Sequence, residues 1–162
     1  MFLICAPASF CIRESTMKIR NLLSIVALAL VSAIVHAASL GPVQVYKDPL
    51  CGCCGKYVEY LRQEGIRVEV ISVSDTAALK ERYGIPRELQ SCHTSVANGY
   101  VIEGHVPVAT LKKLVDEGRA IKGIALPGMP PGSPGMGPVK TATLTTYEIP
   151  TAGERPKVFS VE

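Results

Sequence analysis

The spacing of hydrophobic and polar residues predicts two successive strand–helix pairs. Residues 43–46 and 66–73 are rich in β-forming side chains, so both segments are expected to be strands. Between them, hydrophobic positions recur at helical spacing over residues 54–64, and Gly65 ends this helix. Asp75 is expected to cap a second, short helix. A β-α-β-α order favours a parallel pair of strands joined by a crossover.

A hairpin and a third helix are predicted next. Residues 95–97 and 100–102 have strand composition and flank Asn98-Gly99, the strongest short signal for a two-residue hairpin turn. Pro107 suits the first turn of a helix, and apolar positions then recur at helical spacing. The resulting order, β-α-β-α-β-β-α, is that of a thioredoxin-like domain in the α/β class.

Proline, glycine and methionine dominate the segment after this helix. Nine of the twelve residues in 127–138 are proline or glycine, which excludes a helix or an ordinary strand. Residues 141–149 and 157–161 are expected to form a last β-hairpin or loosely attached strands. The sequence thus predicts one thioredoxin-like domain with a Pro/Gly/Met-rich loop and a C-terminal β segment.

The beginning of the chain has the layout of a secretory signal peptide. Residues 17–20 form a short basic start, residues 22–35 are uncharged and mostly apolar, and tolerated side chains precede a cleavage site after Ala37. The apolar run of 14 residues is shorter than the about 20 that a membrane-spanning helix needs. We therefore expect export to the periplasm, no stable membrane anchor after cleavage, and a mature domain of residues 38–162.

A further extension precedes this signal peptide. Residues 1–16 fit poorly in front of a basic start, so translation is expected to begin at Met17. Residues 1–37 are then an extension plus a signal peptide, and Cys5 and Cys11 would be absent from the mature protein.

The charge of the mature chain is nearly balanced. Three of the 17 basic and one of the 14 acidic residues lie before residue 38, which leaves a net charge near +1. Since no basic cluster is present either, nothing supports nucleic-acid binding.

Three of the four mature-chain cysteines are crowded into the motif Cys51-Gly52-Cys53-Cys54. A C-x-x-C pair at a helix start is typical of redox and metal sites, because the helix N-terminus lowers the thiol pKa. A third cysteine between the pair invites disulfide scrambling in an oxidoreductase, whereas it adds a ligand to a metal site. Thiolates select copper(I) or zinc over ions that prefer oxygen ligands.

The crowding favours several copper(I) ions over one zinc ion. Structural zinc sites usually draw their ligands from two separated pairs of cysteines. Adjacent side chains such as Cys53 and Cys54 tend to point apart, but thiolates that bridge several copper(I) ions need not converge on one point. We therefore expect a polynuclear copper(I) site, with silver(I) or zinc as alternative ions.

Further candidate ligands lie outside the motif. Cys92 is expected beside it, because the loop before the third strand of a thioredoxin-like fold lies there, although a structural disulfide is the alternative in an exported chain. His93 and His105 are candidates, but a lone histidine is more often a satisfied or solvated side chain than a ligand. Met129 and Met136 share a Pro-Gly-Met setting with few core neighbours, so their thioethers can bind metal or cover the site.

Four motifs follow one another along the chain: CGCC at residues 51–54, SCHT at 91–94, GYVIEGHVP at 99–107 and PGMPPGSPGM at 127–136. Together they resemble the CopG-like family, a bacterial group long described as a domain of unknown function and associated with copper resistance. The resemblance covers about residues 42–138. It implies a thioredoxin-like fold, a periplasmic location and a cysteine-bridged copper cluster.

The family's ligands carry over onto specific positions of this chain. Its cysteine ligands correspond to Cys51, Cys53, Cys54 and Cys92, and its proline-glycine-methionine loop corresponds to the segment with Met129 and Met136. Tyr57 departs from the tryptophan expected in many relatives, which should alter packing and not the ligands.

The sequence therefore predicts a periplasmic copper(I)-binding protein that acts in copper handling and resistance. Its expected partners are metal ions and other periplasmic copper-handling proteins. One alternative is a thiol–disulfide oxidoreductase that uses Cys51 as nucleophile and Cys54 as resolving thiol, and another is a domain held together by structural disulfides. The sequence favours metal binding and leaves open whether the protein is also a redox enzyme.

Overall fold

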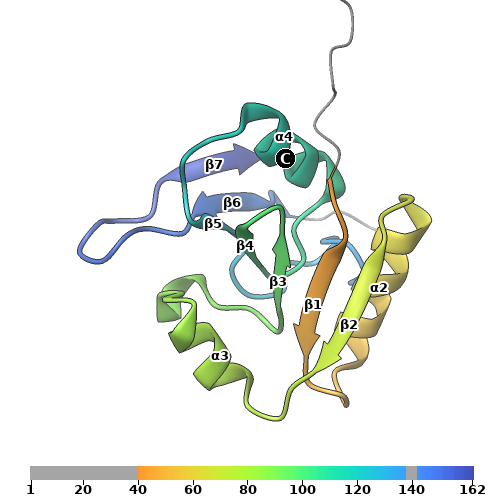
Figure 1. Cartoon of the computed structure of the whole chain (residues 1–162). Coiled ribbons are helices and arrows are strands. Elements are labelled where there is room, and N and C mark those ends of the chain that lie inside the picture. Colours follow the sequence, from red (N-terminus) through yellow and green to blue (C-terminus); the bar gives the residue numbers. More distant parts are fainter. Residues whose placement is uncertain (1–39, 138–141) are drawn as a thin grey trace, which may run out of the picture. The chain divides into compact units, whose positions relative to one another are not determined.

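A seven-stranded mixed sheet runs through residues 40–137 and 142–162, the part of the chain that the computed structural model describes (Figure 1). Its strands lie in the order β2-β1-β3-β4-β5-β6-β7. Three α-helices and a 3-10 turn, η1, accompany the sheet within these residues. In chain order the elements are β1 (Val43–Lys47), α2 (Gly52–Gln63), β2 (Val68–Ser72), α3 (Thr76–Arg82), η1 (Arg87–Leu89), β3 (Thr94–Ala97), β4 (Tyr100–Glu103), α4 (Val108–Glu117), β5 (Gly123–Ala125), β6 (Thr145–Glu148) and β7 (Val158–Val161).

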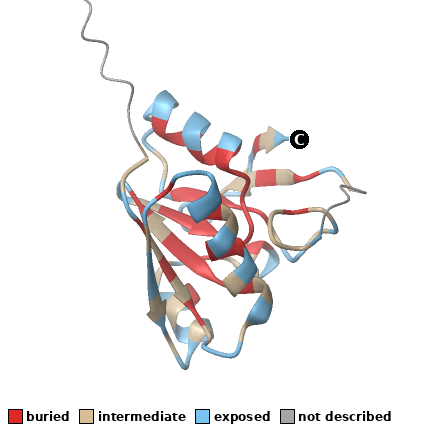
Figure 2. Cartoon of the chain, turned by 90° about the vertical axis from the view of Figure 1, so that its right-hand side faces the viewer, coloured by how far each residue is buried: buried red, intermediate tan, exposed pale blue. Residues whose placement is uncertain are grey.

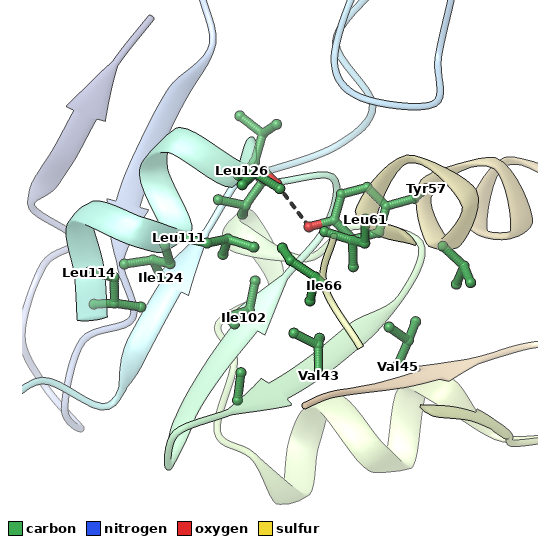
Figure 3. Packing of buried hydrophobic residues seen from close by; sticks show 14 of the residues in the cluster. Val43, Val45, Tyr57, Leu61, Ile66, Ile102, Leu111, Leu114, Ile124 and Leu126 are labelled. Atoms are coloured by element: carbon green, nitrogen blue, oxygen red, sulfur yellow. Dashed lines mark hydrogen bonds between the residues drawn. The ribbon is translucent and has the colours of Figure 1, made fainter. Parts of the chain in front are cut away.

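The helices α2 and α4 pack against one face of the sheet and enclose the main hydrophobic core (Figure 3). Both helices are amphipathic: their buried residues lie on the side that faces the sheet, and their exposed residues lie on the outer side (Figure 2). Alternate residues of β1 point into the same core, as the period of two in a strand requires. The core includes Val43, Val45, Tyr57, Leu61, Ile102, Leu111, Leu114 and Ile124.

The opposite face of the sheet carries a smaller apolar cluster. Val101 and Ala125 pack there against residues that follow α3, among them Ile85 and Leu89. Neighbouring strand residues point to opposite faces, so Ile102, next to Val101, belongs to the main core. The segment from α3 to η1 thus covers the side of the sheet that α2 and α4 leave open.

The order of α-helices and strands predicted from the sequence is confirmed from β1 to α4. The strands β1 and β2 are parallel neighbours, and the Asp75 side chain caps α3 by accepting a hydrogen bond of 2.8 Å from the backbone N–H of Ala78. Asn98 and Gly99 both have positive φ angles, 49° and 81°, which a type I′ hairpin turn requires. Residues 127–137 contain neither helix nor strand.

The strand β5 is the one strand of the described residues that the sequence did not predict. With three residues it is too short to show an alternating pattern, and its neighbours β4 and β6 define it by pairing on both sides. Gly123 is needed there because a Cβ atom would lie 1.8 Å from the Val101 carbonyl oxygen.

The predicted extension and signal peptide, residues 1–37, lie outside the described residues, as do Cys5 and Cys11. The first residue of the predicted strand 141–149 also lies outside them. Among the helices that are described, none has the length and apolar character needed to span a membrane.

The C-terminal strands form an antiparallel hairpin that extends the sheet, rather than loosely attached strands. Phe159 of β7 is 6 % exposed and belongs to the main core. The Lys113 ammonium lies 5.0 Å from the centre of the Phe159 ring and donates a hydrogen bond of 3.2 Å to the Phe159 carbonyl oxygen. The hairpin is therefore anchored to α4.

We expect Phe159→Ala to lower the free energy of unfolding by about 3 kcal/mol, because it removes a buried aromatic ring from the core. Val161 on the same strand is 60 % exposed, so Val161→Ala serves as the control and should cost at most about 0.5 kcal/mol. Urea unfolding followed by circular dichroism measures both values. Equal, small effects would mean that the hairpin is not part of the core.

Candidate metal centre

The cysteine motif lies where β1 ends and α2 begins. The buried Lys47 ammonium donates to the carbonyl oxygens of Asp48, at 2.7 Å, and Pro49, at 3.3 Å, and so shapes the connecting loop. The backbone N–H of Cys51 donates to the Asp48 carbonyl oxygen at 3.0 Å. Cys51 thereby becomes the N-cap residue of α2, and the motif occupies the first turn of the helix.

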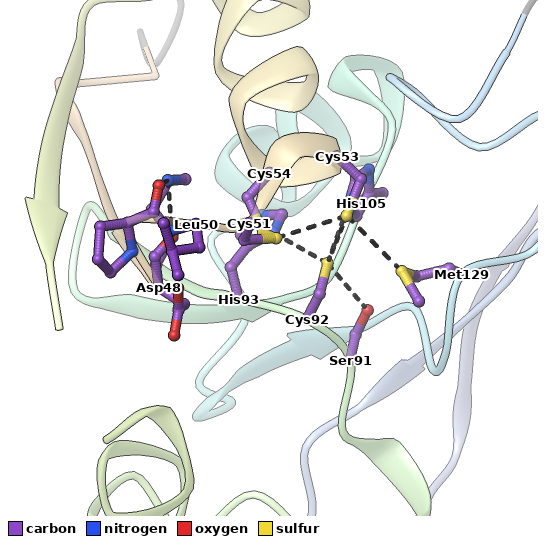
Figure 4. The surroundings of a disulfide bond; sticks show 12 residues. Asp48, Leu50, Cys51, Cys53, Cys54, Ser91, Cys92, His93, His105 and Met129 are labelled. Carbon is purple, nitrogen blue, oxygen red and sulfur yellow. Dashed lines mark hydrogen bonds between the residues drawn. A yellow bond between two sulfur atoms is a disulfide. The ribbon is translucent and has the colours of Figure 1, made fainter. Parts of the chain in front are cut away.

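Two of the three motif cysteines form a disulfide. Cys51 is bonded to Cys54, whose side chain is fully buried on the inner side of α2 (Figure 4). Cys53 is a free, half-buried thiol, and its sulfur lies 3.4 Å from that of Cys51. The helix thus points Cys53 and Cys54 in different directions while Cys51 lies next to both.

Cys92 reaches the motif from the loop before β3. Its free sulfur lies 3.9 Å from the Cys53 sulfur, although 39 residues separate the two in sequence. The ligand atoms of the four cysteines all lie within 4.8 Å of one another. The structure therefore brings the four sulfurs named in the sequence analysis into one cluster.

Both candidate histidines also contact Cys92 (Figure 4). The His105 Nε2 atom lies 3.0 Å from the Cys92 sulfur, and the His93 Nδ1 atom lies 3.5 Å from it. The Nδ1 atom of His105 is 2.6 Å from the Pro134 carbonyl oxygen. A carbonyl can only accept, so Nδ1 carries the proton and the lone pair of Nε2 faces Cys92.

Three buried rings support this side of the cluster. The rings of His93 and His105 are 4.9 Å apart and lie 4.8 and 5.0 Å from the ring of Tyr57. The Tyr57 hydroxyl donates to the Val106 carbonyl oxygen at 2.8 Å, which satisfies it in the core. The Nε2 atom of His93 has no hydrogen-bond partner among the described residues, although the side chain is fully buried.

The Pro/Gly/Met-rich loop covers the outer side of the cluster. The Met129 sulfur lies 3.8 Å from that of Cys53, and its side chain is 48 % exposed. Gly135, with a φ angle of 79°, lets the loop approach α2, since a Cβ atom there would lie 2.8 Å from the Tyr57 nitrogen. Within the described residues Met136 makes no sulfur contact of the kind that Met129 makes; its backbone N–H bonds to the Ser133 carbonyl oxygen.

Burial governs the protonation of the groups around Cys92. It raises the pKa of the Cys92 thiol to about 11, and the neighbouring Cys53 adds to the shift. It lowers the pKa of His93 to about 3, with His105, Lys80 and Lys47 contributing in the same direction. It also lowers the pKa of His105, against the opposing effect of the hydrogen bond to Pro134. At neutral pH the two imidazoles are therefore neutral, which is the form that binds metals.

The sequence did not indicate the buried ion pair near the site. Glu103 is fully buried at the end of β4, and Lys80 of α3 is 5 % exposed. Their ion pair, at 2.9 Å, lies beside Ser91, the residue before Cys92. Strand periodicity could have indicated that Glu103 is buried, because it shares the covered face of Val101, but not that Lys80 is its partner.

The chain is similar to proteins of known structure. The family described as "Protein of unknown function, DUF411" matches residues 89–136. A solved structure named "Copper resistance protein copG- Form 2" is 36 % identical, with a TM-score of 0.68, over 76 % of this chain and 98 % of its own. A second, named "Copper resistance protein copG- Form 1", is 35 % identical, with the same TM-score and coverage. No curated protein matches the chain.

The neutral state of His93 predicts a loss of stability in acid. In the unfolded chain histidine binds a proton below about pH 6.5, whereas folded His93 does so only near its lowered pKa of about 3. Between these values the unfolded state binds more protons, so the free energy of unfolding falls by about 1.4 kcal/mol for each unit that the pH falls.

Urea unfolding of the metal-free protein between pH 6 and pH 4 tests this expectation. The pH dependence should be weaker in His93→Gln than in the unsubstituted protein, because glutamine does not titrate. If the two proteins lose stability equally over this range, His93 is not held neutral by the fold.

Proposed function

The chain belongs to the CopG-like family, and on that premise we propose that it is a periplasmic copper(I)-binding protein that acts in copper handling and resistance. The metal is its cargo and is held as a cysteine-bridged cluster of several ions. The proposal rests on one observation above all: four cysteine sulfurs lie within 4.8 Å of one another.

The chemistry of the donor atoms supports copper(I). Thiolate and thioether sulfur are soft ligands, and the cluster offers four cysteines together with Met129, 3.8 Å from Cys53. Carboxylate oxygens, which magnesium and calcium favour, do not contribute to either of the ligand clusters found in the described residues. The site thus fits copper(I) or silver(I) in preference to hard cations.

The directions of the sulfurs favour a cluster over a single ion. Cys54 points into the core from α2, while Cys53 points toward the half-exposed Met129. A single tetrahedral zinc ion would need four sulfurs at about 2.3 Å around one point. Bridging thiolates relax this demand, because each sulfur serves two ions on different sides.

The neutral histidines extend the donor set. Cys92, His93 and His105 form a second group whose ligand atoms also lie within 4.8 Å of one another. Cys92 belongs to both groups, so a thiolate at this position can bridge an ion bound mainly by sulfur and an ion bound partly by nitrogen.

Metal binding by all four cysteines requires a reduced site. The Cys51–Cys54 disulfide offers no thiolate, and two electrons and two protons convert it into two thiols. The oxidation state of this pair therefore determines how much metal the site holds.

The location and the fold type complete the proposal. The signal-peptide pattern of residues 17–37 supports export to the periplasm. The β1-α2-β2 unit, the β3–β4 hairpin and α4 support a thioredoxin-like description, with the cysteine motif at the end of the first strand.

The disulfide also favours a second candidate function. Cys51 and Cys54 form the C-x-x-C pair of a thiol–disulfide oxidoreductase, and Cys51 caps the helix. In that case insulin reduction should be abolished by Cys51→Ser and retained by Cys53→Ser. A copper protein should instead lose metal with either substitution.

Anaerobic copper(I) titration tests the main proposal. It uses the reduced protein from Ala38 onward, since residues Ala38–Glu162 form a compact unit of their own. Mass spectrometry of the intact complex should count more than one copper ion per chain. Each of Cys51→Ser, Cys53→Ser, Cys54→Ser and Cys92→Ser should lower the count, because each removes a bridging sulfur.

Thr110→Val is the matched control for these variants. Thr110 is a buried polar residue of α4 whose hydrogen bond to Glu162 lies outside the cysteine cluster, so its loss should leave the copper count unchanged. A count of one zinc ion per chain, without a preference for copper, would contradict the proposal.

The raised pKa of Cys92 predicts how copper binding depends on pH. With a pKa of about 11, the thiol is protonated at neutral pH, so binding a metal there must release a proton. Affinity should therefore fall as the pH falls, by about tenfold per pH unit for each proton displaced. Competition with a copper(I) chelator between pH 6 and pH 8 measures this slope. Cys92→Ser should reduce it by one proton, and an unchanged slope would show that Cys92 is not a ligand.

A further inference from the structure

Glu103, the last residue of β4, and the two residues after it hold the three residues centred on Cys92. The Glu103 carboxylate accepts a hydrogen bond of 2.6 Å from the backbone N–H of Ser91. The backbone N–H of Gly104 donates to the His93 carbonyl oxygen at 3.0 Å. His105 Nε2 lies 3.0 Å from the Cys92 sulfur itself. The loop is thus fixed on both sides of the thiol and at the thiol.

We propose that Glu103 is a positioning residue that places the Cys92 thiol in the sulfur cluster. The Lys80 ammonium neutralises the Glu103 carboxylate and so makes the burial of this charge tolerable. The effect of Glu103 on metal affinity rests on the proposed function. The placement of Cys92 is a property of the metal-free protein and can be measured without copper.

The hydrogen bonds of Glu103 are the first support. One carboxylate oxygen accepts from the Ser91 N–H and from the Lys80 ammonium, which is 2.9 Å away. The other accepts from the Thr94 hydroxyl at 2.6 Å. Three donors from α3, β3 and the Cys92 loop thus converge on one fully buried side chain. Because the side chain is fully buried, loss of the acceptor would leave the Ser91 N–H without a partner, which costs more than an average hydrogen bond contributes.

The cost of burying these charges is the second support. A buried ion pair contributes little net stability, because removing two charges from water offsets most of their attraction. Replacement by apolar residues is often neutral or stabilising. Stability alone therefore does not explain a carboxylate at this point, whereas an acceptor for the N–H next to Cys92 does.

The packing around Ser91 is the third support. Its hydroxyl donates to the Gly128 carbonyl oxygen at the start of the Pro/Gly/Met-rich loop. A Cβ atom on Gly104 would lie 2.7 Å from the Ser91 Cβ and 2.5 Å from the Leu126 carbonyl oxygen, so only glycine lets β4 approach this closely. Glu103 therefore orients a residue that links the Cys92 loop with the loop that carries Met129.

Two double variants separate the acceptor from the charge. Glu103→Gln/Lys80→Met removes both charges but keeps a carbonyl oxygen that can accept from the Ser91 N–H. Glu103→Leu/Lys80→Met removes the same charges and the acceptor as well. Both replace the ion pair by uncharged side chains of similar size, which cores tolerate, so both are expected to fold. Thr94→Val is the control, because it deletes another bond of Glu103 and leaves Ser91 in place.

The position of Cys92 is read out through its disulfide with Cys53. The two sulfurs are 3.9 Å apart, so the equilibrium constant for this disulfide in glutathione buffers reports how often the thiols meet. Peptide mapping by mass spectrometry quantifies it in the metal-free protein from Ala38 onward, with Cys51→Ser/Cys54→Ser as the common background so that no neighbouring disulfide exchanges with Cys53. Copper(I) affinity, measured on the fully reduced protein by chelator competition, is the second readout.

We expect Glu103→Leu/Lys80→Met to lower the disulfide equilibrium constant by about tenfold, the equivalent of one lost buried hydrogen bond, and to weaken copper binding similarly. Glu103→Gln/Lys80→Met and Thr94→Val should stay within about threefold of the unsubstituted protein, since both keep the Ser91 contact. A purely structural role would change unfolding free energies without separating the two double variants.

Equal equilibrium constants in the two double variants, whether both normal or both lowered, would overturn the positioning role. Failure of the unsubstituted protein to bind copper(I) would instead contradict the proposed function. In that case the glutathione equilibrium still decides whether Glu103 positions Cys92.

Discussion

The site depends on holding one thiol of a distant loop against the first turn of a helix. Cys53 is fixed by α2, but Cys92 lies 39 residues further on and has to be brought to within 3.9 Å of it. An unrestrained loop would lose much of this contact to conformational entropy. The end of β4 supplies the restraint, through a buried carboxylate, a glycine that permits close approach and a histidine that meets the sulfur.

The same arrangement sets a gradient of exposure across the cluster. Cys54 and both histidines are fully buried, whereas Cys53 is half-buried and Met129 is nearly half exposed. Under the proposed function, copper therefore meets the thioether and Cys53 first and the buried donors afterwards. The hydrogen bond from His105 Nδ1 to the Pro134 carbonyl oxygen keeps the Nε2 lone pair directed toward Cys92. His105 therefore needs no rearrangement to bind a metal ion there.

The sequence predicted the parts of the fold that local chemistry determines. The Asp75 cap, the turn at Asn98 and Gly99 and the amphipathic face of α2 each follow from a few neighbouring residues. The strand β5 could not be predicted in this way, because its pairing with β4 and β6 on either side determines it.

The sulfur atoms of the candidate site could be predicted from the sequence, but the buried ion pair beside the Cys92 loop could not. Crowded cysteines are visible as a motif, and the fold order placed Cys92 near them. The pairing of Lys80 with Glu103 joins a helix to a strand, and no local pattern reports such a contact. The sequence also treated Met129 and Met136 alike, whereas the path of the loop brings the first to the cluster.

X-ray absorption at the copper edge tests the central claim most directly. The sample is the reduced protein from Ala38 onward, loaded anaerobically with copper(I). We predict a coordination shell dominated by sulfur together with scattering from neighbouring copper ions at short distance, since the thiolates bridge several ions. A shell of nitrogen and oxygen atoms, or isolated copper ions without copper neighbours, would contradict a cluster built on the four converging cysteines.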